Sequence, residues 1–308
     1  MKHSFGANLA FFVLTSPFWL GSTHVLPGDQ RSTSPADPTI SGPSGKERRQ
    51  WQLYDENPPE PPAVVFRGDS RSPEQLRALG GIPTEFGGPL NDNESYSLMA
   101  HHRAACDLGK CLSAYTSTGR AFGSALLFAG GEDRRKKVDG WMYKIHATPN
   151  MIDMDYSGFE LTYFMETEFS ALGGIRWDQI EGWMPAPAST YEFIKKKALN
   201  EVTFEDFQRQ TRQDWPKAWI ANPEYNKKYD SYLASKGQPQ LSGDEKNLKT
   251  HGKMSLKEYA VEFMKKNGES VGWSGGNSPF LNLTAPAKPW SGKSPLNDTS
   301  AAFPNKSR

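Results

Sequence analysis

The sequence has almost no net charge, only two cysteines and few long hydrophobic runs. The 36 Lys and Arg residues nearly balance the 35 Asp and Glu residues, so the net charge is only +1. This balance argues against binding to nucleic acid or to an anionic membrane through overall charge. The basic runs at 134–137 and 195–197 have no interleaved aromatic residues, so they predict no nucleic-acid site. Beyond residue 23 no apolar stretch is long enough to predict a membrane-spanning helix.

The N-terminus has the pattern of a secretory signal peptide. Lys2 and His3 precede an apolar run at 9–14, and the small residues at 21–23 suit a cleavage site. The alternative is a mildly apolar N-terminus without a targeting role. Residues 24–62 are rich in Pro, Ser and Gly, which favours an extended linker or pro-segment over a packed core. We therefore expect a secreted protein with a signal peptide at 1–23.

A short apolar strand is predicted at 63–66, and it continues into Arg67, Asp69 and Arg71. In a strand these three alternating residues share one face. Two guanidinium groups can bind a phosphate or carboxylate, and the intervening carboxylate can hold one of them in place. A surface ion-pair cluster would explain the triplet equally well.

Other segments carry secondary-structure signals. A helix is predicted at 73–79, because Ser72 can cap it, Pro73 suits its first position and Gly80 can end it. Strands are predicted at 112–118 and 140–147, and further helices around 98–102, 121–129, 203–207, 215–233 and 256–267. His101 and His102 are adjacent on the helix predicted around 98–102. Because adjacent helical residues point in different directions and no third ligand has a usable spacing, we predict no metal site.

A pair of carboxylates, Glu166 and Glu168, follows an aromatic segment with strand character. In a strand Thr167 would point away from both, so the two carboxylates would project into one site. The pattern is common, however, and it also fits two solvated glutamates on an edge strand. The neighbouring motifs have to decide between these interpretations.

Taken in order, the Arg-x-Asp-x-Arg strand, the hydroxyl-rich strand ending at Ser117 and Thr118, and the Glu-x-Glu pair resemble the mono-ADP-ribosyltransferase toxins. The similarity is greatest to the catalytic A subunits of the cholera toxin and heat-labile enterotoxin group. It runs from about residue 65 to residue 183, with the longest matching segments at 66–71, 147–151, 168–175 and 178–183. The whole chain also resembles the enterotoxin-A-like secreted proteins of fungi.

The resemblance implies an α+β fold. Its expected core is a split, mixed β-sheet surrounded by helices, with NAD in the cleft and no Rossmann signature. The resemblance places the catalytic domain at 63–188. Helical spacing predicts a mostly helical extension at 189–274, and a composition rich in Pro, Ser and Asn predicts a disordered tail at 275–308.

The resemblance also assigns roles to single residues. Glu168 would be the catalytic glutamate, because an anion there stabilises charge that develops as the nicotinamide–ribose bond breaks. Glu166 would orient an acceptor arginine and take its proton. Arg67 would act beside them while gripping NAD, which is the implied substrate. The residues implied in NAD binding are Arg67, Asp69, Ser70, His101, Ser117 and Thr118. His101 matches a histidine of the family pattern, whereas His102 does not.

The implied partner is a host protein with an acceptor arginine, such as a G protein α subunit, reached inside a host cell. A receptor-binding B subunit is a second implied partner. The turns before the glutamate pair read the target in this family, which makes Tyr156 and an exposed Phe159 the predicted recognition residues. Burial of Phe159 in the core is the alternative. Two other functions stay open: an NAD glycohydrolase that uses water, and a non-catalytic secreted interaction protein on the same fold.

Cys106 and Cys111 are the only cysteines, and in a secreted protein they predict a disulfide. They fall in the segment that forms a mobile loop over the NAD site in the resembling family, so a bridge would staple that loop. We expect a reductant to change the rate of NAD hydrolysis, measured as nicotinamide release with and without the reductant. An unchanged rate would leave the bridge a merely structural feature.

Overall fold

A computed structural model of the chain describes residues 59–84, 94–103, 113–129, 138–161, 167–194, 197–213 and 215–287. The predicted signal peptide, most of the predicted linker, Glu166 and both cysteines lie outside the described residues. None of the described helices is long and apolar enough to cross a membrane.

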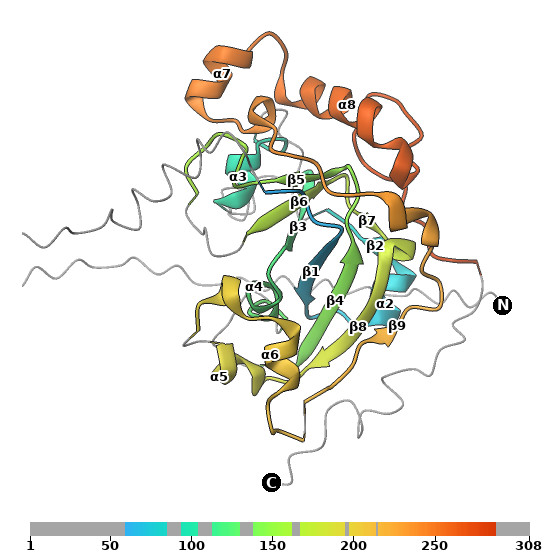
Figure 1. The fold of residues 1–308 in the computed structure, drawn as a ribbon. Helices are drawn as coiled ribbons and strands as arrows, with labels where there is room; N and C mark the ends of the chain where they lie inside the picture. The colour runs from blue at the N-terminus through green and yellow to red at the C-terminus, as the bar shows by residue number, and fades with distance from the viewer. Residues whose placement is uncertain are drawn as a thin grey trace, which may run out of the picture. The chain divides into compact units, whose positions relative to one another are not determined.

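The described residues are organised around a seven-stranded sheet (Figure 1). Its strands, in the order β5-β6-β3-β1-β4-β8-β9, are β5 (Met151–Asp153), β6 (Glu168–Leu172), β3 (Tyr115–Gly119), β1 (Val64–Asp69), β4 (Gly140–His146), β8 (Ile180–Ala186) and β9 (Ile220–Ala221). Every ladder between these strands is antiparallel. The expected α+β class is confirmed, but the expectation of a mixed sheet is wrong. Strands β3 and β4 point in the same direction, but they do not form a parallel pair, because β1 lies between them and pairs antiparallel with both.

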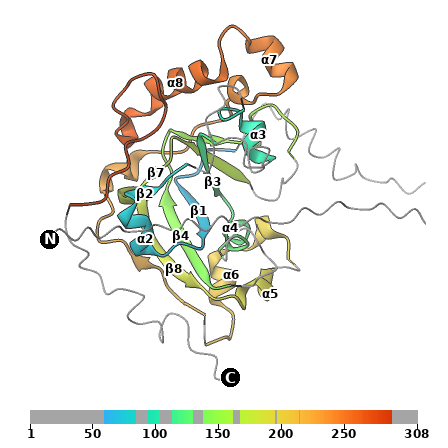
Figure 2. The same ribbon diagram turned by 180° about the vertical axis from the view of Figure 1, so that it is seen from behind.

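Short helices surround the sheet, as Figures 1 and 2 show from opposite sides. They are α2 (Pro73–Ala78), α3 (Leu98–His102), α4 (Phe122–Leu126), α5 (Thr190–Ile194), α6 (Phe204–Gln208), α7 (Glu245–His251) and α8 (Leu256–Asn267). Single turns of 3-10 helix are η2 (Trp177–Gln179), η3 (Leu199–Glu201), η4 (Lys227–Ser231), η5 (Pro239–Leu241) and η6 (Glu269–Val271). A two-stranded sheet pairs β2 (Gly81–Ile82) with β7 (Ile175–Arg176).

Local sequence signals account for several of these elements. Ser72 and Gln75 form the predicted capping box at the start of α2. Strand β4 and helix α8 also lie where the sequence predicts them. The helix predicted at 215–233 is wrong, because this segment holds β9 and η4. Pro216 and Pro223 lack the N–H that a continuous helix needs there.

The predicted extension shares its core with the predicted catalytic domain. Phe207 of α6 and Trp215 stack at 4.9 Å within the same hydrophobic cluster as Phe122 of α4 and Met142 of β4. Helix α8 adds Met264 and neighbouring side chains to a cluster that includes strands β3 and β6. The boundary expected at residue 188 therefore separates no independent core.

Part of the predicted disordered tail also packs on the sheet. Leu281 is only 8% exposed, and its N–H donates to the carbonyl of Gly173 at 3.1 Å. The expected start of the tail at residue 275 is therefore wrong, because an apolar side chain beyond it is buried.

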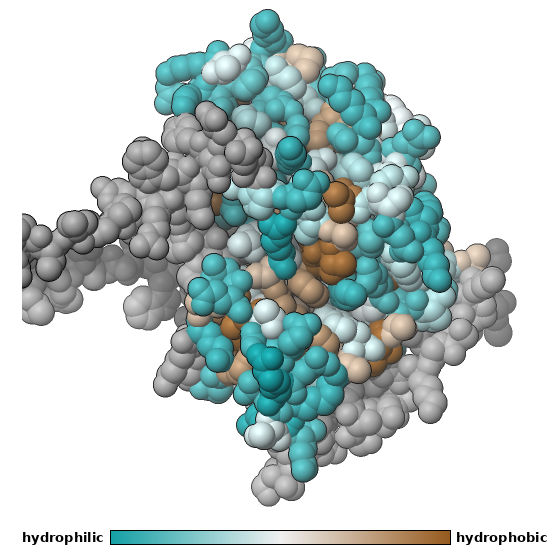
Figure 3. All heavy atoms as spheres, viewed as in Figure 1, coloured by the Kyte–Doolittle hydropathy of each residue, from teal (hydrophilic) through white to brown (hydrophobic). Residues whose placement is uncertain are grey.

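On the face seen in Figure 1, hydrophobic side chains gather in the middle, over the central strands, with hydrophilic ones around them (Figure 3).

Three of the segments that carry the family resemblance meet in a buried hydrogen-bond network. Asn150 Nδ2 donates to the carbonyls of Leu172 at 2.9 Å and Gly174 at 3.3 Å. Thr148 Oγ1 donates to Asn150 Oδ1 at 2.7 Å and accepts from Gln179 Nε2 at 2.8 Å. The side chains of Thr148, Asn150 and Gln179 are fully buried. Because each has its partner within the network, the network fixes how the end of β6 sits against η2.

Asn150→Ala should lower the free energy of unfolding by about 2–3 kcal/mol, because it leaves buried carbonyl groups without their donor. Urea denaturation followed by circular dichroism measures this change. Asn200→Ala is the control, because Asn200 is exposed on η3 and the change there should stay within about 0.5 kcal/mol. Equal effects of the two substitutions would contradict a structural role for the network.

Candidate active site

Strands β1, β3 and β6 are neighbours in the sheet, and they carry the predicted site residues Arg67, Ser117 and Glu168. The register pairs Ser117 with Ser170 and Gly119 with Glu168. Since alternate residues share a face, Ser117, Glu168 and Ser170 point to the same side of the sheet.

Thr118 points to the other side of β3. It is buried, and its hydroxyl donates to the carbonyl of Phe169 at 2.6 Å. Ser70 is exposed at the end of β1. The structure thus brings Ser117 to Glu168 but leaves Thr118 and Ser70 outside this group, and their contact with NAD stays a prediction.

Arg67 joins two strands at the point where they diverge. Strands β1 and β3 are in register only at Phe66 and Gly119, so their ladder does not continue. Arg67 Nη1 donates to the carbonyl of Ser117 at 2.6 Å, and Arg67 Nε donates to Asp69 Oδ2 at 3.1 Å. The guanidinium therefore bridges β1 and β3 in place of a backbone hydrogen bond.

Asp69 holds both arginines of the triplet. Arg71 Nε donates to Asp69 Oδ1 at 2.8 Å and Arg71 Nη2 donates to Oδ2 at 2.5 Å, in addition to the contact with Arg67. Burial alone would raise the pKa of Asp69, but the hydrogen bond from Arg71 and the charges of Arg67 and Arg71 lower it to about 2. Asp69 is therefore an ionised group at the base of the site.

Glu168 is buried, and both of its carboxylate oxygens are in contact with side chains. Ser170 Oγ donates to Oε1 at 2.8 Å, and His101 Nε2 lies 3.3 Å from the same oxygen. His102 Nδ1 lies 3.1 Å from Oε2. His101 also lies 2.9 Å from Ser117 Oγ, through Nε2. The predicted residues His101, Ser117 and Glu168 therefore form one cluster.

His102 belongs to this cluster although the sequence does not predict it. Successive side chains on a helix differ in direction by about 100°, so the sequence suggests that only one of two adjacent histidines reaches a given site. Here Glu168 lies between the two directions and both rings reach it, one at each oxygen. The adjacency of the two histidines is the only signal in the sequence, and there it raises a metal site that we do not predict.

The two imidazoles keep Glu168 ionised. Burial alone would raise the pKa of this carboxyl group, but hydrogen bonds from His101 and His102 and the electrostatic interaction with these two side chains hold the pKa well below its usual range. A buried carboxylate of this kind is an anionic group shielded from solvent.

Thr167, the residue just before Glu168, has an unusual backbone conformation. Among the described residues it is the only non-glycine residue with a positive φ, at 45°. Its carbonyl accepts from the N–H of Arg120 at 3.0 Å, and its Oγ1 accepts from the N–H of Ala121 at 3.2 Å. Because β6 begins only at Glu168, the expectation of a strand that runs through Thr167 is wrong, and the orientation of Glu166, which lies outside the described residues, stays a prediction. A left-handed β-branched residue is costly, and such residues concentrate at functional sites.

In the turn predicted to recognise the target, Phe159 is buried rather than exposed. Phe159 is 2% exposed, and its ring lies 5.9 Å from the ring of His102. The expectation of an exposed, target-reading Phe159 is therefore wrong, because its apolar ring packs into the core against the histidine. Tyr156 is half-buried, and its role in recognition stays a prediction.

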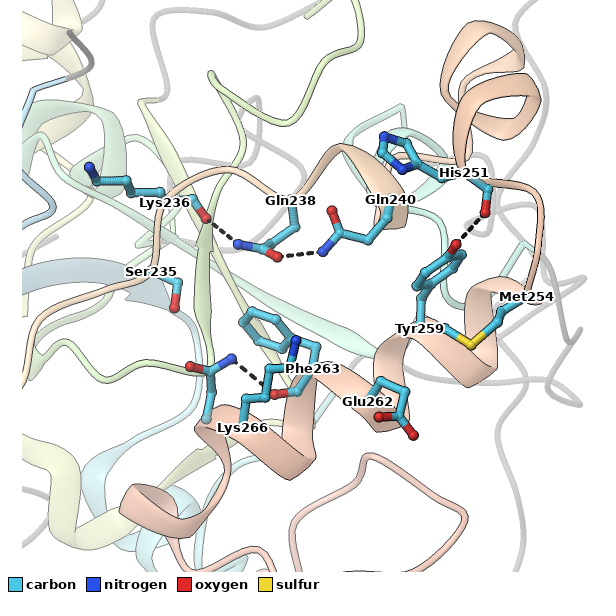
Figure 4. A pocket seen from close by; sticks show the side chains of 11 residues that line it. Ser235, Lys236, Gln238, Gln240, His251, Met254, Tyr259, Glu262, Phe263 and Lys266 are labelled. Atoms are coloured by element: carbon cyan, nitrogen blue, oxygen red, sulfur yellow. Dashed lines mark hydrogen bonds between the residues drawn. The ribbon is translucent and has the colours of Figure 1, made fainter.

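A separate cavity of about 570 Å³ lies between α8 and residues 235–240 (Figure 4). Its polar side chains bond within the lining: Gln240 Nε2 donates to Gln238 Oε1 at 2.6 Å, and Tyr259 donates to the carbonyl of His251. None of the predicted site residues lines this cavity. It is therefore distinct from the Glu168 cluster.

Asp69→Asn should destabilise the fold in a pH-dependent way. The pKa of Asp69 in the fold, about 2, lies below its ordinary value of 3.8. Ionised Asp69 therefore stabilises the fold above about pH 4, by about 2 kcal/mol, and this contribution is lost as the pH falls through 4 toward 2. Urea denaturation should show a deficit in the variant at pH 7 that shrinks below about pH 4. Glu201→Gln, at an exposed carboxylate, is the control, and a pH-independent deficit in Asp69→Asn would contradict the assignment.

Comparison with known proteins shows where this arrangement belongs. The family model of the heat-labile enterotoxin alpha chain matches residues 60–262. The chain is 35% identical over 127 residues to the A chain of heat-labile enterotoxin IIB from Escherichia coli, covering 38% of this chain and 46% of that relative. It is 32% identical over 127 residues to the NAD(+)–arginine ADP-ribosyltransferase Chelt of Vibrio cholerae, covering 38% of this chain and 20% of the relative. The match thus spans about half the length of the enterotoxin relative and less of the second.

Solved structures give weaker likenesses. A heat-labile enterotoxin mutant has a TM-score of 0.38 at 23% identity and covers 58% of this chain and 87% of its own. A scabin toxin variant from Streptomyces scabies has a TM-score of 0.34 at 19% identity and covers 64% of this chain and 98% of its own. These scores are low, so the family assignment rests on the sequence match. That match includes every strand of the seven-stranded sheet and most of the chain, and the protein therefore belongs to the heat-labile enterotoxin alpha chain family of ADP-ribosyltransferase toxins.

Proposed function

We propose that this protein is a secreted toxin that transfers ADP-ribose from NAD to an arginine of a host protein and releases nicotinamide. Family membership supports the proposal, and so does the activity named for the Vibrio cholerae relative. The structural observation that carries it is the buried, ionised Glu168, clamped by two histidines and a serine.

The charged residues present suit NAD as a substrate. NAD offers two phosphate groups, ribose hydroxyls and a nicotinamide–ribose bond whose cleavage leaves positive charge on the ribose. Arg67 supplies a fixed cation for the phosphates, because Asp69 and the carbonyl of Ser117 orient its guanidinium. Glu168 supplies an anion that can accept from a ribose hydroxyl and stabilise the developing charge. Seclusion of Glu168 from solvent strengthens that interaction.

The two glutamates take different parts in the proposed transfer. Glu168 acts as the nicotinamide–ribose bond breaks and its electron pair leaves with nicotinamide. Glu166 orients the acceptor guanidinium; as the arginine nitrogen forms its bond to the ribose carbon, Glu166 accepts the proton that this nitrogen loses.

The partners enter the proposal as classes. The acceptor is a host protein with an accessible arginine, and a G protein α subunit is the first candidate to test. A receptor-binding B subunit would serve cell entry. Incubation of the protein and labelled NAD with host cell extract, followed by identification of the labelled protein, tests this part directly.

Glu168→Ala should reduce both ADP-ribose transfer and NAD hydrolysis by at least about 100-fold, because the charge of the transition state loses its counterion. Glu166→Ala should lose transfer to a small guanidino acceptor but retain part of the hydrolysis, since water needs no guanidinium to be deprotonated. Labelled NAD measures transfer, and nicotinamide release measures total cleavage.

Glu160→Ala is the matched control, because this carboxylate is exposed and should be dispensable for cleavage. Full activity of the Glu168→Ala protein would overturn the proposed function. Hydrolysis without any transfer in the wild-type protein would replace it with NAD glycohydrolase activity.

A further inference from the structure

His102 has contacts that set it apart from the other residues around Glu168. Its side chain is only 1% exposed, and Nδ1 lies 3.1 Å from Glu168 Oε2. Ser170 and His101 both contact the opposite oxygen, Oε1. Of the side chains with a described contact to this carboxylate, His102 alone reaches Oε2.

Two elements fix the position of the His102 ring. The N-cap Ser97 starts α3, accepting from the N–H of Ala100 at 3.0 Å and donating to the carbonyl of Ser242 at 2.9 Å. The ring of Phe159 packs against the imidazole from the turn after β5. The imidazole is therefore held both through its own helix and by an apolar neighbour.

Contact with both oxygens has a specific mechanical effect. The last torsion of a glutamate side chain is broad, so a carboxylate held at one oxygen can still rotate about that bond. A donor on the second oxygen fixes the plane of the group. An oxygen that must meet a ribose hydroxyl in the transition state benefits from that restriction, because misorientation lowers the rate.

We propose that His102 is a positioning residue that donates through Nδ1 to Glu168 Oε2 and so fixes the plane of the catalytic carboxylate. The inference rests on the proposed function, since it assigns His102 to the same reaction. The described polar contact of the His102 side chain is with Glu168, whereas the His101 ring also contacts the hydroxyls of Ser117 and Ser113. Loss of His102 should therefore affect the chemical step more than NAD binding.

The charged groups around Glu168 determine how a pH profile is interpreted. His101 and His102 face it from α3, and Arg67 approaches the cluster from β1 through Ser117. Asp153 lies on β5, the strand next to β6, and burial raises its pKa to about 6, opposed by backbone hydrogen bonds and by Arg120. If the acid limb of the kcat–pH profile arises from Asp153, it will keep its position in a His102 variant and will disappear in Asp153→Asn. If it arises from Glu168, it will move when His102 is lost, so the readout is the shift of this limb along the pH axis.

The test compares His102→Ala, His102→Asn and Met99→Ala in the full chain. His102→Ala should lower kcat for nicotinamide release by about 10- to 100-fold, the effect of losing a hydrogen bond to a charged group, with a smaller change in KM for NAD. The acid limb should move to higher pH, because the carboxylate loses a partner that favours its ionised form. His102→Asn should recover much of the rate, since its side-chain amide places an N–H close to the position of Nδ1.

Met99→Ala controls for disturbance of α3, because Met99 lies on the same helix, is partly buried in the hydrophobic core and is not among the side chains with a described contact to Glu168. Melting temperatures of all three variants separate folding from chemistry. The inference is overturned if His102→Ala keeps the wild-type kcat and pH profile, or if Met99→Ala loses as much kcat as His102→Ala at an equal melting temperature.

A measurement without substrate keeps the two proposals apart. With labelled glutamate, an NMR titration follows the carboxyl carbon of Glu168, and its midpoint should rise in His102→Ala and return toward the wild-type value in His102→Asn. If the wild-type protein fails to cleave NAD, the proposed function fails while this titration still decides the contact. If NAD is cleaved and the midpoint stays unchanged in His102→Ala, the inference fails alone.

Discussion

A carboxylate removed from water needs replacement partners, and Glu168 finds them on two elements, its own strand β6 and helix α3. Ser170 lies on its own strand, and the two histidines come from α3. The carboxylate in turn fixes where α3 can lie, because both imidazoles are drawn to its two oxygens. Strand β3 supplies Ser117, which contacts His101, and its carbonyl accepts from Arg67 on β1. One buried negative charge thus links the helix to three adjacent strands.

The same dependence extends to parts of the chain that looked peripheral. Helix α8 and the segment around Leu281 pack against the strands that carry the site, and Ser242 accepts from Ser97 at the start of α3. The C-terminal residues therefore help to hold the histidines in place. A sequence division into catalytic domain and extension describes where family motifs are dense, whereas the hydrophobic clusters describe what folds together.

The features that the sequence predicts well are those with a local cause. The capping box at Ser72 and the strand around Trp141 depend on neighbouring residues, and the motif around Glu168 carries a family pattern. The missed features depend on contacts distant in sequence. Phe159 is buried because its ring packs on His102, and His102 belongs to the site because its ring contacts Glu168, which is distant in sequence. The left-handed backbone at Thr167 defeats a strand argument that assumes regular alternation.

Thr167 also has a consequence for protein engineering. Within a regular strand, inserting one residue turns every later side chain to the opposite face. The left-handed conformation of Thr167 breaks this regular alternation. Its carbonyl and hydroxyl oxygens accept hydrogen bonds from the backbone N–H groups of Arg120 and Ala121, which fix the chain just before Glu168. The register of β6 against β3 therefore does not depend on a regular strand through Thr167, and an engineered change at this position acts on the hydrogen bonds that hold the chain just before Glu168 rather than on strand pairing.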